Sequence, residues 1–370
     1  MGTPFTKGAS DIIGLFQGGS IVANGLKPEF TLSKELNIDL GFFDSRANLK
    51  FAYFETNTTN QTVPVQISRS TGFVSALVNT GEMLNKGFEV DLNTTPVLTS
   101  SGIKWTVGIN YTNTITNTPL SVYGTALNEL NVLNANRNPT NSWAVVGYEY
   151  PVIKTQDWVR DPQGRVVVDA ITGNPSRDPN QKIFGQANPK HRLGLNTSLS
   201  YAGLTLSVTA EYRAGGYIYN QLGQDIEFGG IGFQSAEAGR QRFVYPNSVI
   251  KAADGTYTPN TNVTVKEGNY DFWQGLYNTV GGNYVTSSDF WKIREIALNY
   301  QLPASWTQKT GFVKRASIGV NGRNLFMWRP ASNQWTDPEF SNDNSNAAGE
   351  TSRNQIPPAR VFGGNLTITF

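Results

Sequence analysis

The sequence predicts an all-β protein whose strands form part of an antiparallel transmembrane β-barrel with long extracellular loops. Three observations carry this prediction: nine alternating segments, connections that are by turns short and long, and a terminal strand that ends on an aromatic residue. Only 38% of the 370 residues are hydrophobic, the mean hydropathy is −0.34, and no run approaches 18 consecutive apolar residues. These values exclude a helical membrane protein. They do not exclude a barrel, because its spans alternate apolar and polar residues.

Nine segments alternate between apolar and polar or small residues, which is the period-2 pattern of a strand with two unlike faces. In the first segment every even position from Leu36 to Phe42 is apolar, and the fourth alternates without interruption from Ile103 to Tyr111. The other segments follow the same rule. The nine expected strands are residues 35–43, 49–55, 86–96, 103–112, 191–201, 204–213, 290–302, 315–326 and 361–370.

Short and long connections alternate along the chain. Short turns are expected at residues 44–46, 99–102, 202–203 and 303–314, and long loops at about 56–85, 113–190, 214–289 and 327–360. Outer-membrane barrels have this alternation because their periplasmic turns are short and their extracellular loops are long. A soluble sandwich has no reason to place every long loop at one end. Since the C-terminus of a bacterial barrel lies in the periplasm, counting back from Phe370 places all four short turns on the periplasmic side.

The apolar faces of the expected strands carry almost no charge in their central residues. The opposite faces carry Asp39, Glu89, Asp91, Glu211, Arg213 and Glu295. If the apolar rows face lipid, these charges line a wet interior, where they cost little. In a soluble sandwich they would face solvent, so this observation alone does not separate the two architectures.

The terminal strand ends on its last aromatic residue. Its two faces carry Phe362, Gly364, Leu366, Ile368 and Phe370 on one side, and Gly363, Asn365, Thr367 and Thr369 on the other. A strand that stops on a terminal Phe is typical of the closing strand of an outer-membrane barrel. We predict that its apolar face, meaning Phe362, Leu366, Ile368 and Phe370, is the signal read by the barrel-insertion machinery. The alternative is a soluble sandwich whose last strand ends on Phe.

Composition excludes several classes of function. The net charge of +2 is too small to imply a nucleic-acid partner. The absence of cysteine excludes a disulfide framework, a thiolate nucleophile and a Cys-ligated zinc. The one histidine, His191, opens an expected strand, where a structural role is favoured over a metal site or a catalytic triad. We therefore expect no cofactor and no metal. Residues 1–4 begin without the basic and apolar regions of a signal peptide, so we expect a mature chain or a fragment.

Nine strands raise a difficulty for a barrel. Single-chain bacterial barrels have an even number of strands, and nine antiparallel strands leave two open edges that lipid does not tolerate. Either a further strand lies within residues 1–30 or a long loop, or the chain is the C-terminal part of a larger barrel.

Family resemblance supports the larger barrel. Residues 79–89, NTGEMLNKGFE, resemble an N-x-G…N-K-G-x-E stretch, and residues 290–303, FWKIREIALNYQLP, resemble F-x-K-L-R-x-x-x-L-x-Y-x-L-P. Similar stretches follow in family order, namely residues 26–31 near the start and residues 322–325, 337–339 and 357–363 near the end. Together these stretches resemble the SusC/RagA branch of the TonB-dependent outer-membrane transporters, over nearly the whole chain.

The resemblance implies a barrel of about 22 strands with a plugged lumen, located in the cell outer membrane. It implies a transporter, not an enzyme, that imports a nutrient such as an oligosaccharide or a peptide. The implied partners are a SusD-like surface lipoprotein, outer-membrane lipid and the TonB complex, which acts through the plug. Residues 1–370 are expected to be the C-terminal barrel part, since the plug, the TonB-contacting segment and a signal peptide are absent from the sequence.

The extracellular loops are expected to carry the ligand contacts. The candidate ligand-binding residues are loop aromatics, namely Trp143, Tyr150, Trp158, Trp273, Tyr277 and Trp335. Aromatic rings stack on the apolar faces of sugars, and amides such as Asn333 and Gln334 can bond sugar hydroxyls. The alternative for each aromatic is an interfacial girdle or loop packing. Trp105 and Tyr111 are assigned to the barrel wall.

Acidic residues in the last loop pose a separate question. Asp337, Glu339 and Asp343, with Asn342, Asn344 and Asn346 nearby, carry the oxygen ligands that Ca²⁺ prefers. Their spacing does not match an EF-hand loop, so a solvated acidic loop is the favoured interpretation.

Two other functions are weighed against import. A passive porin formed by this chain alone would conduct ions across a bilayer. A soluble carbohydrate-binding or glycosidase domain would need, for hydrolysis, two carboxylates about 5–9.5 Å apart. No such pair stands out among the 28 acidic residues.

Overall fold

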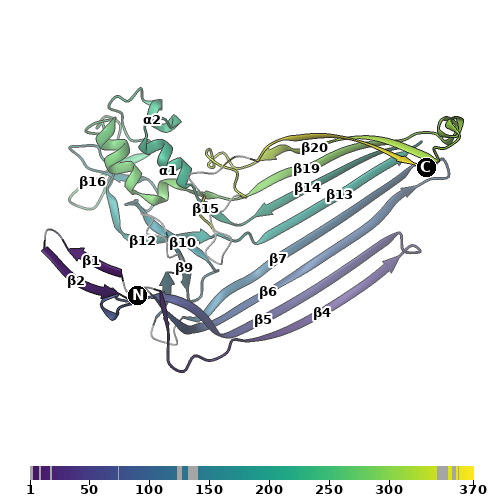
Figure 1. The fold of residues 1–370 in the computed structure, drawn as a ribbon. Helices are drawn as coiled ribbons and strands as arrows, with labels where there is room; N and C mark the ends of the chain where they lie inside the picture. The colour runs from purple at the N-terminus through teal and green to yellow at the C-terminus, as the bar shows by residue number, and fades with distance from the viewer. Residues whose placement is uncertain are drawn as a thin grey trace.

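The computed structural model describes residues 3–7, 10–16, 19–73, 75–122, 127–131, 141–339, 349–351, 356 and 358–370. These residues form one large, curved antiparallel sheet with a lobe of loops at one end (Figure 1). The strands of this sheet, in spatial order, are β21 (Val361–Thr369), β20 (Arg315–Trp328), β19 (Phe290–Gln301), β14 (Leu204–Ala214), β13 (His191–Tyr201), β7 (Lys104–Val122), β6 (Ser75–Leu98), β5 (Ala47–Gln66) and β4 (Phe30–Phe42). A short strand, β3 (Ser20–Val22), pairs with β6 in parallel.

The nine predicted strands are confirmed, and each pairs with its expected neighbours. Their short connections lie at the same end of the sheet as the C-terminus (Figure 1). The tightest of these connections is Ala202-Gly203 between β13 and β14, where both residues have positive φ, of 50° and 83°. Such a two-residue turn matches the twist of the strands that it joins.

The predicted long loop at residues 56–85 is wrong. The strands β5 and β6 continue past the alternating stretch as a long hairpin, whose register reaches Gln66 opposite Ser75. β7 likewise continues to Val122. The strict alternation ends in these extensions, because residues 56–62 of β5 are polar on both faces and rich in threonine, and residues 75–85 of β6 mix apolar and polar residues on both faces. Backbone pairing continues, since threonine is well suited to strands.

One face of the sheet is apolar and exposed. Leu36, Leu366 and Phe362 have exposed fractions of 58%, 65% and 76%, and their neighbours in the same rows are also exposed. Soluble monomers rarely expose a contiguous apolar face that extends over many strands. The face therefore requires lipid, and a soluble sandwich is not supported.

The opposite face is polar and closely packed. Gly319 lies between Asn299 and Asn365 on the neighbouring strands, and a Cβ atom there would overlap both amides. Gly363 faces Asn321 in the same way. Alternating asparagine and glycine thus give this inner face a hydrogen-bonding surface.

Aromatic rings mark both ends of the apolar face. At the end with the short turns, the rings of Phe312 and Phe370 stack with centroids 6.0 Å apart. At the other end, Tyr212 stacks on Trp291 with centroids 4.7 Å apart. Aromatic girdles of this kind occur where a barrel meets the two membrane interfaces.

Trp105 and Tyr111 lie on the apolar row of β7, as predicted. The Trp105 indole donates to Thr197 Oγ1 on the neighbouring strand at 2.8 Å. Tyr111 Oη and Asn113 Nδ2 lie 2.8 and 2.9 Å from His191 Nδ1. These bonds tie β7 to β13 and give His191 a structural role.

The lobe at the other end contains small sheets and short helices (Figure 1). One sheet has the order β12 (Arg177–Gln186), β10 (Val152–Trp158), β9 (Asn141–Val145) and β8 (Glu129–Asn131), and another has β11 (Val166–Val168), β16 (Ser248–Lys251) and β17 (Tyr257–Pro259). The short strands β15 (Tyr217–Tyr219) and β18 (Val285–Ser287) pair with each other. The helical elements lie between them in the sequence: α1 (Gln221–Phe228), α2 (Phe233–Glu237) and the short helical turns η2 (Asp271–Leu276), η3 (Tyr277–Thr279) and η4 (Gly281–Tyr284). The remaining elements are the hairpin β1 (Thr3–Lys7) and β2 (Ser10–Phe16), the turn η1 (Arg69–Thr71), and α3 (Ala304–Thr307) with η5 (Gln308–Thr310). Within the described ranges, no helix has the length and apolar character needed to cross a membrane.

The apolar row of β21 provides a test of the lipid-facing assignment. Leu366→Arg should destabilise the folded protein by about 2–4 kcal/mol, because it places a charge near the middle of the lipid-facing band. Thr367→Arg puts the same charge on the inner face and should cost far less. Urea unfolding of the receptor in lipid vesicles measures both. Equal costs for the two variants would contradict the assignment.

Candidate functional site

A chain of aromatic rings crosses the lobe. It begins at Trp158, at the end of β10, and continues to Tyr277 with ring centroids 6.3 Å apart. From Tyr277 it continues to Tyr284 at 6.0 Å and then to Trp335 at 5.8 Å. Trp273 joins it beside Tyr277 at 4.9 Å. Four of the six predicted aromatics, from loops far apart in the sequence, therefore belong to one cluster.

Part of this cluster lines an open cleft of about 490 Å³. Its aromatic residues are Trp158, Phe243, Tyr245, Trp273 and Tyr277, and its polar residues include Arg160, Gln234, Glu237, Asn247 and Asn283. A few polar groups around an apolar, aromatic floor are typical of small-molecule sites, whose volumes are about 300–1,000 Å³.

The polar atoms of these aromatic side chains already form hydrogen bonds within the protein. The indole of Trp158, which is only 2% exposed, donates to Asn283 Oδ1 at 2.7 Å. The indole of Trp273 donates to Gly268 O at 3.1 Å, and the hydroxyl of Tyr277 donates to Gln234 Oε1 at 3.1 Å. Trp158 is therefore a buried part of the wall of the cleft. The half-buried Trp273 and Tyr277 present ring surface to the cleft.

Burial keeps the tyrosines of the cluster neutral. It raises the pKa of Tyr245 to about 12, and it raises the pKa values of Tyr277 and Tyr284 well above their ordinary value. Their hydroxyls therefore remain protonated at physiological pH. The Tyr277 hydroxyl donates to Gln234, and the Tyr284 hydroxyl accepts from Asn278 Nδ2 at 3.4 Å.

A buried glutamate supports the cleft wall. Glu227, on α1, is fully buried, and its Oε2 accepts from the backbone N–H of Ser235 on α2 at 3.0 Å. Burial raises the pKa of this carboxyl, and its Oε1 has no hydrogen-bond partner among the described residues. The bond holds α2, with Gln234 and Glu237, beside the cleft.

The other two predicted aromatics lie elsewhere. The ring of Trp143, on β9, lies under the ammonium of Lys154, 4.7 Å from its centroid. Tyr150 packs against a separate small core that includes Val122 and Leu130. Neither residue lines the aromatic cleft, so the structure does not bring all six predicted residues together.

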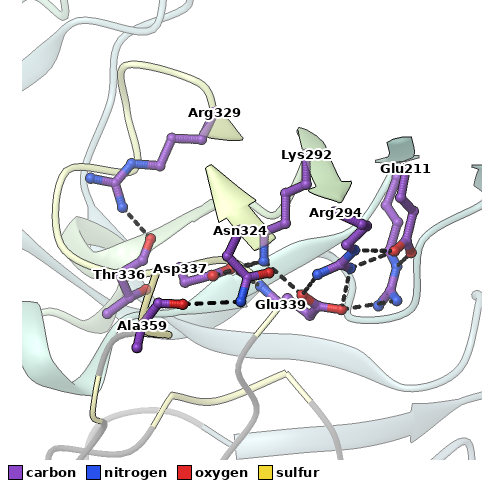
Figure 2. Close-up of polar contacts among 10 residues, drawn as sticks. Glu211, Lys292, Arg294, Asn324, Arg329, Thr336, Asp337, Glu339 and Ala359 are labelled. Atoms are coloured by element: carbon purple, nitrogen blue, oxygen red, sulfur yellow. Dashed lines mark hydrogen bonds and ion pairs between the residues drawn. The ribbon is translucent and has the colours of Figure 1, made fainter. Parts of the chain in front are cut away.

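The polar inner face contains an ionic network that the sequence did not indicate (Figure 2). Lys292 Nζ, which is almost fully buried, lies 2.7 Å from both oxygens of Asp337 and 2.6 Å from Glu339 Oε2. Arg294 donates to Glu339 Oε2 at 2.7 Å and also to Glu211. Arg213 completes the network by pairing with Glu211 and Glu339. The network therefore contains three basic and three acidic side chains, and their formal charges sum to zero.

A β-bulge puts Arg294 in this network. Ala210 pairs with Ile293 and Thr209 with Glu295, so Arg294 is an extra residue relative to β14. A bulge shifts the alternation by one position. As a result Trp291 and Ile293 stay on the apolar face with Ile296 and Leu298, while Lys292 and Arg294 both point inward. The irregular spacing of apolar residues between Ile293 and Ile296 was the available signal in the sequence.

The network anchors a bridging segment, residues 329–339, to the sheet. Asp337 and Glu339 bind side chains of the sheet. The Thr336 hydroxyl donates to Oδ1 of the buried Asn220 at 2.7 Å. The Trp335 ring packs on Gly223 of α1. Arg329 donates to the carbonyl of Thr336 and closes the segment (Figure 2). The bridging segment therefore connects the sheet to the aromatic cluster.

The favoured interpretation of a solvated acidic loop is wrong for Asp337 and Glu339. Asp337 is 6% exposed, and both carboxylates pair with Lys292. Lysine ammonium occupies the positions that a cation would take. In the described part of the chain, no group of three or more acidic or histidine side chains is placed to hold a metal. Asp343, Asn342, Asn344 and Asn346 lie outside the described residues.

Most strands of this sheet lie in a region that matches a known protein family. A family model described as "TonB dependent receptor-like, beta-barrel" matches residues 5–325. The chain belongs to this family of outer-membrane receptors. The resemblance noted from the motifs is thereby confirmed, and the apolar face of the sheet is the lipid-facing surface of a TonB-dependent receptor barrel.

Curated relatives agree with this assignment. TonB-dependent receptor P3 of Formosa agariphila is 22% identical over 370 residues, which cover 94% of this chain and 35% of the relative. TonB-dependent receptor P26 of the same organism is 25% identical, with 92% and 34% covered. The chain spans about a third of the length of these relatives.

Solved structures share the fold. The RagAB peptide transporter matches with a TM-score of 0.68 and 17% identity, over 92% of this chain and 35% of the matched chain. The RagAB peptide importer in its "open-open" state matches with a TM-score of 0.67 and 16% identity, over 100% of this chain and 38% of the other. The open sheet therefore corresponds to part of a closed receptor barrel.

Removal of one network charge should release the bridging segment. Lys292→Met leaves Asp337 buried without its cation, which costs about 3–5 kcal/mol locally. Amide hydrogen exchange in residues 329–339 should rise, while exchange in β13 and β14 stays slow. Lys50→Met, which removes an exposed pair 4.0 Å from Asp39, is the matched control and should change little. Unchanged exchange in Lys292→Met would contradict the anchoring role.

The segment should also respond to acid. Burial acts to raise the pKa of Glu339, but the hydrogen bonds and charges of Arg294 and Lys292 outweigh it and lower the pKa to about 2. A depressed pKa stabilises the fold above the unfolded-state value of about 4.5, and this stabilisation is lost as the pH falls toward 2. Protection of residues 329–339 from hydrogen exchange, corrected for intrinsic rates, should therefore be constant from pH 7 to 5 and should fall below pH 4.5. Protection that persists to pH 2 would contradict this assignment. Glu339→Gln should show weak protection already at pH 7.

Proposed function

We propose that this chain is the C-terminal barrel part of a SusC-like transporter that imports an oligosaccharide or a peptide across the outer membrane. The observation that carries the proposal is the position of the aromatic cleft. It lies in the lobe at the end of the sheet opposite the short turns, which is the extracellular end of a receptor barrel. The apolar sheet supplies the wall, and the lobe supplies the first ligand contacts.

The proposed ligand contacts are the predicted aromatics, in unequal roles. Trp273 and Tyr277 present ring surface to the cleft, and sugar rings or apolar peptide side chains can stack there. Trp158 and Trp335 position these rings through the aromatic cluster. Trp143 and Tyr150 belong to a separate region of the lobe. No catalytic group is assigned, since the proposal is transport without chemical change of the ligand.

The partners follow from the same proposal. The extracellular lobe faces the space where a SusD-like surface lipoprotein would lie over the barrel. The polar inner face, with its asparagine and glycine rows, would contact the plug through which the TonB complex acts. Closure of the barrel requires strands of the same receptor beyond β4 and β21.

The terminal strand is proposed to carry the insertion signal. Phe362, Leu366, Ile368 and Phe370 form one exposed row along β21. Such a row is open to a partner that recognises alternate side chains of an edge strand.

Binding measurements test the role of the cleft. Purified full-length receptor is first screened with fluorescent oligosaccharides and short peptides. Trp273→Ala should weaken binding of the best ligand at least tenfold, or about 1.4 kcal/mol, because it removes a half-buried ring whose surface faces the cleft. Trp306→Ala, which removes an exposed tryptophan at the opposite end of the sheet, is the control and should bind like the wild type.

Uptake measurements test transport. Cells that lack the receptor gene should fail to take up the best ligand, and uptake should return with the wild-type gene but not with the Trp273→Ala variant. Receptor-independent uptake of every ligand that binds would contradict the proposed function. Ion conductance in planar bilayers by the purified chain alone would instead support a passive porin.

A further inference from the structure

The bridging segment, residues 329–339, contacts the sheet at one end and the aromatic cluster at the other. On the inner face of the sheet, Lys292 Nζ lies 2.7 Å from both oxygens of Asp337 (Figure 2). In the lobe, the centroid of the Trp335 ring lies 5.8 Å from that of the Tyr284 ring. Trp335 and Asp337 are two residues apart, and such a stretch of chain spans at most about 7 Å. A displacement of Asp337 is therefore passed to Trp335.

The ionic network has a buried side and a side that is open to the lumen. The side chains of Lys292 and Asp337 are only 7% and 4% exposed, so they form the buried anchor of the bridging segment. The side chains of Glu211, Arg294 and Glu339 are 24%, 25% and 27% exposed on the inner face. Glu339 contacts both Arg294 and Lys292, so a change on the open side of the network reaches the buried anchor.

A buried amide holds the middle of the bridging segment against the lobe. Asn220 is fully buried, and its Oδ1 accepts from the hydroxyl of Thr336 at 2.7 Å. Its Nδ2 donates to the carbonyl of Tyr284 at 3.0 Å and to Thr286 Oγ1 at 2.9 Å. Thr336 and Tyr284 are thus bound by the same side chain. The bridging segment cannot move relative to Tyr284 without breaking buried hydrogen bonds, which is costly.

A glycine lets the bridging segment pack directly on α1. A Cβ atom at Gly223 would lie 2.6 Å from the Trp335 ring, so the ring can occupy its position only because Gly223 has no side chain. The Trp335 ring contacts Tyr284, and the Tyr284 ring lies 6.0 Å from the ring of Tyr277, which lines the cleft. Closely packed interiors transmit displacements because they are hard to compress. The contacts from Lys292 to Tyr277 are therefore continuous.

We propose that the bridging segment couples the aromatic cleft to the ionic network on the inner face, so that a ligand in the cleft and the Lys292–Asp337 contact stabilise each other. This inference rests on the proposed function, because it takes the cleft as the ligand site. Lys292 and Asp337 are then positioning residues that act on the ligand through Trp335. Such coupling is reciprocal, because each of the two contacts changes the stability of the other by the same factor.

Hydrogen exchange in the full-length receptor tests the coupling without a ligand. Gly223→Ala should displace the Trp335 ring and raise exchange at least threefold both in residues 329–339 and in η2 and η3, which carry the rings of the cleft. A weaker helix cannot explain this result, since alanine favours a helix more than glycine does. Gly229→Ala is the matched control at the end of the same helix, where the nearest atom to an added Cβ is 3.4 Å away, and exchange should not change.

The same measurement starts from the other end of the contacts. Lys292→Met should raise exchange in η2 and η3 as well as in residues 329–339, while exchange in β9, elsewhere in the lobe, stays slow. Arg323→Met removes the ion pair with Glu295 on the same two strands and should leave η2 and η3 unchanged. A heat-modifiability assay on gels confirms that each variant is folded, and either of Gly223→Ala and Lys292→Met carries the test if the other does not fold.

A bound probe tests reciprocity. The probe is the fluorescent oligosaccharide or peptide that binds most tightly in the binding screen. It should slow exchange in residues 329–339 of the wild type, and its affinity should fall about tenfold in Lys292→Met but not in Arg323→Met. A purely structural role of Lys292 would not produce protection of residues 329–339 by a probe that binds in the cleft.

Two results would overturn the coupling. One is unchanged exchange in η2 and η3 of the folded variants, and the other is a bound probe that leaves residues 329–339 unprotected. The uptake measurement separates these failures from failure of the proposed function. Receptor-dependent uptake without transmission between the two sites leaves transport standing and rejects the coupling. Transmission in the variants without receptor-dependent uptake of any ligand rejects transport and leaves the contact between wall and cleft standing.

Discussion

Lipid offers no hydrogen-bond partners to a polypeptide backbone, and this constraint governs the whole architecture. Every N–H and C=O group within the membrane must be paired by a neighbouring strand. Strands that satisfy this requirement have one face toward lipid and one toward the lumen, so their sequences alternate. The nine long strands of this chain obey that rule, and the two edges of their sheet require further strands of the receptor.

The ionic network on the inner face shows how the wall supports the lobe. Charges buried in pairs are costly unless their hydrogen bonds are complete. Here the bulge at Arg294 turns a second cation inward without moving the apolar row out of lipid. The bridging segment is thereby attached to the sheet at Asp337 and to α1 at Trp335. The positions of the rings that line the cleft therefore depend on the ionic contacts between the bridging segment and the sheet.

The sequence predicted the wall well and the lobe poorly, for a physical reason. Within the lipid-facing band, alternate residues of a strand face lipid and lumen in turn. The alternation from Leu36 to Phe42 is therefore sufficient to identify β4. Outside the band, β5 continues with polar residues on both faces and β6 with apolar and polar residues mixed on both faces, so no local pattern marks these extensions.

The candidate site depends on contacts between distant segments. Trp158 and Trp273 were chosen as loop aromatics, but nothing local indicated that they join one cluster while Trp143 does not. Lys292 and Asp337 meet across a loop, and only the broken spacing around Arg294 hinted at a bulge.

The most direct test of the central account is the orientation of the sheet in the membrane. The sequence contains no cysteine, so single cysteines can be introduced at Ile231, in the turn between α1 and α2, and at Ser101, in a short turn, in a receptor otherwise free of cysteine. In intact cells, a membrane-impermeant maleimide should label the Ile231→Cys variant and not the Ser101→Cys variant. Both should react once the outer membrane is opened. Labelling of the Ser101→Cys variant in intact cells would contradict the account.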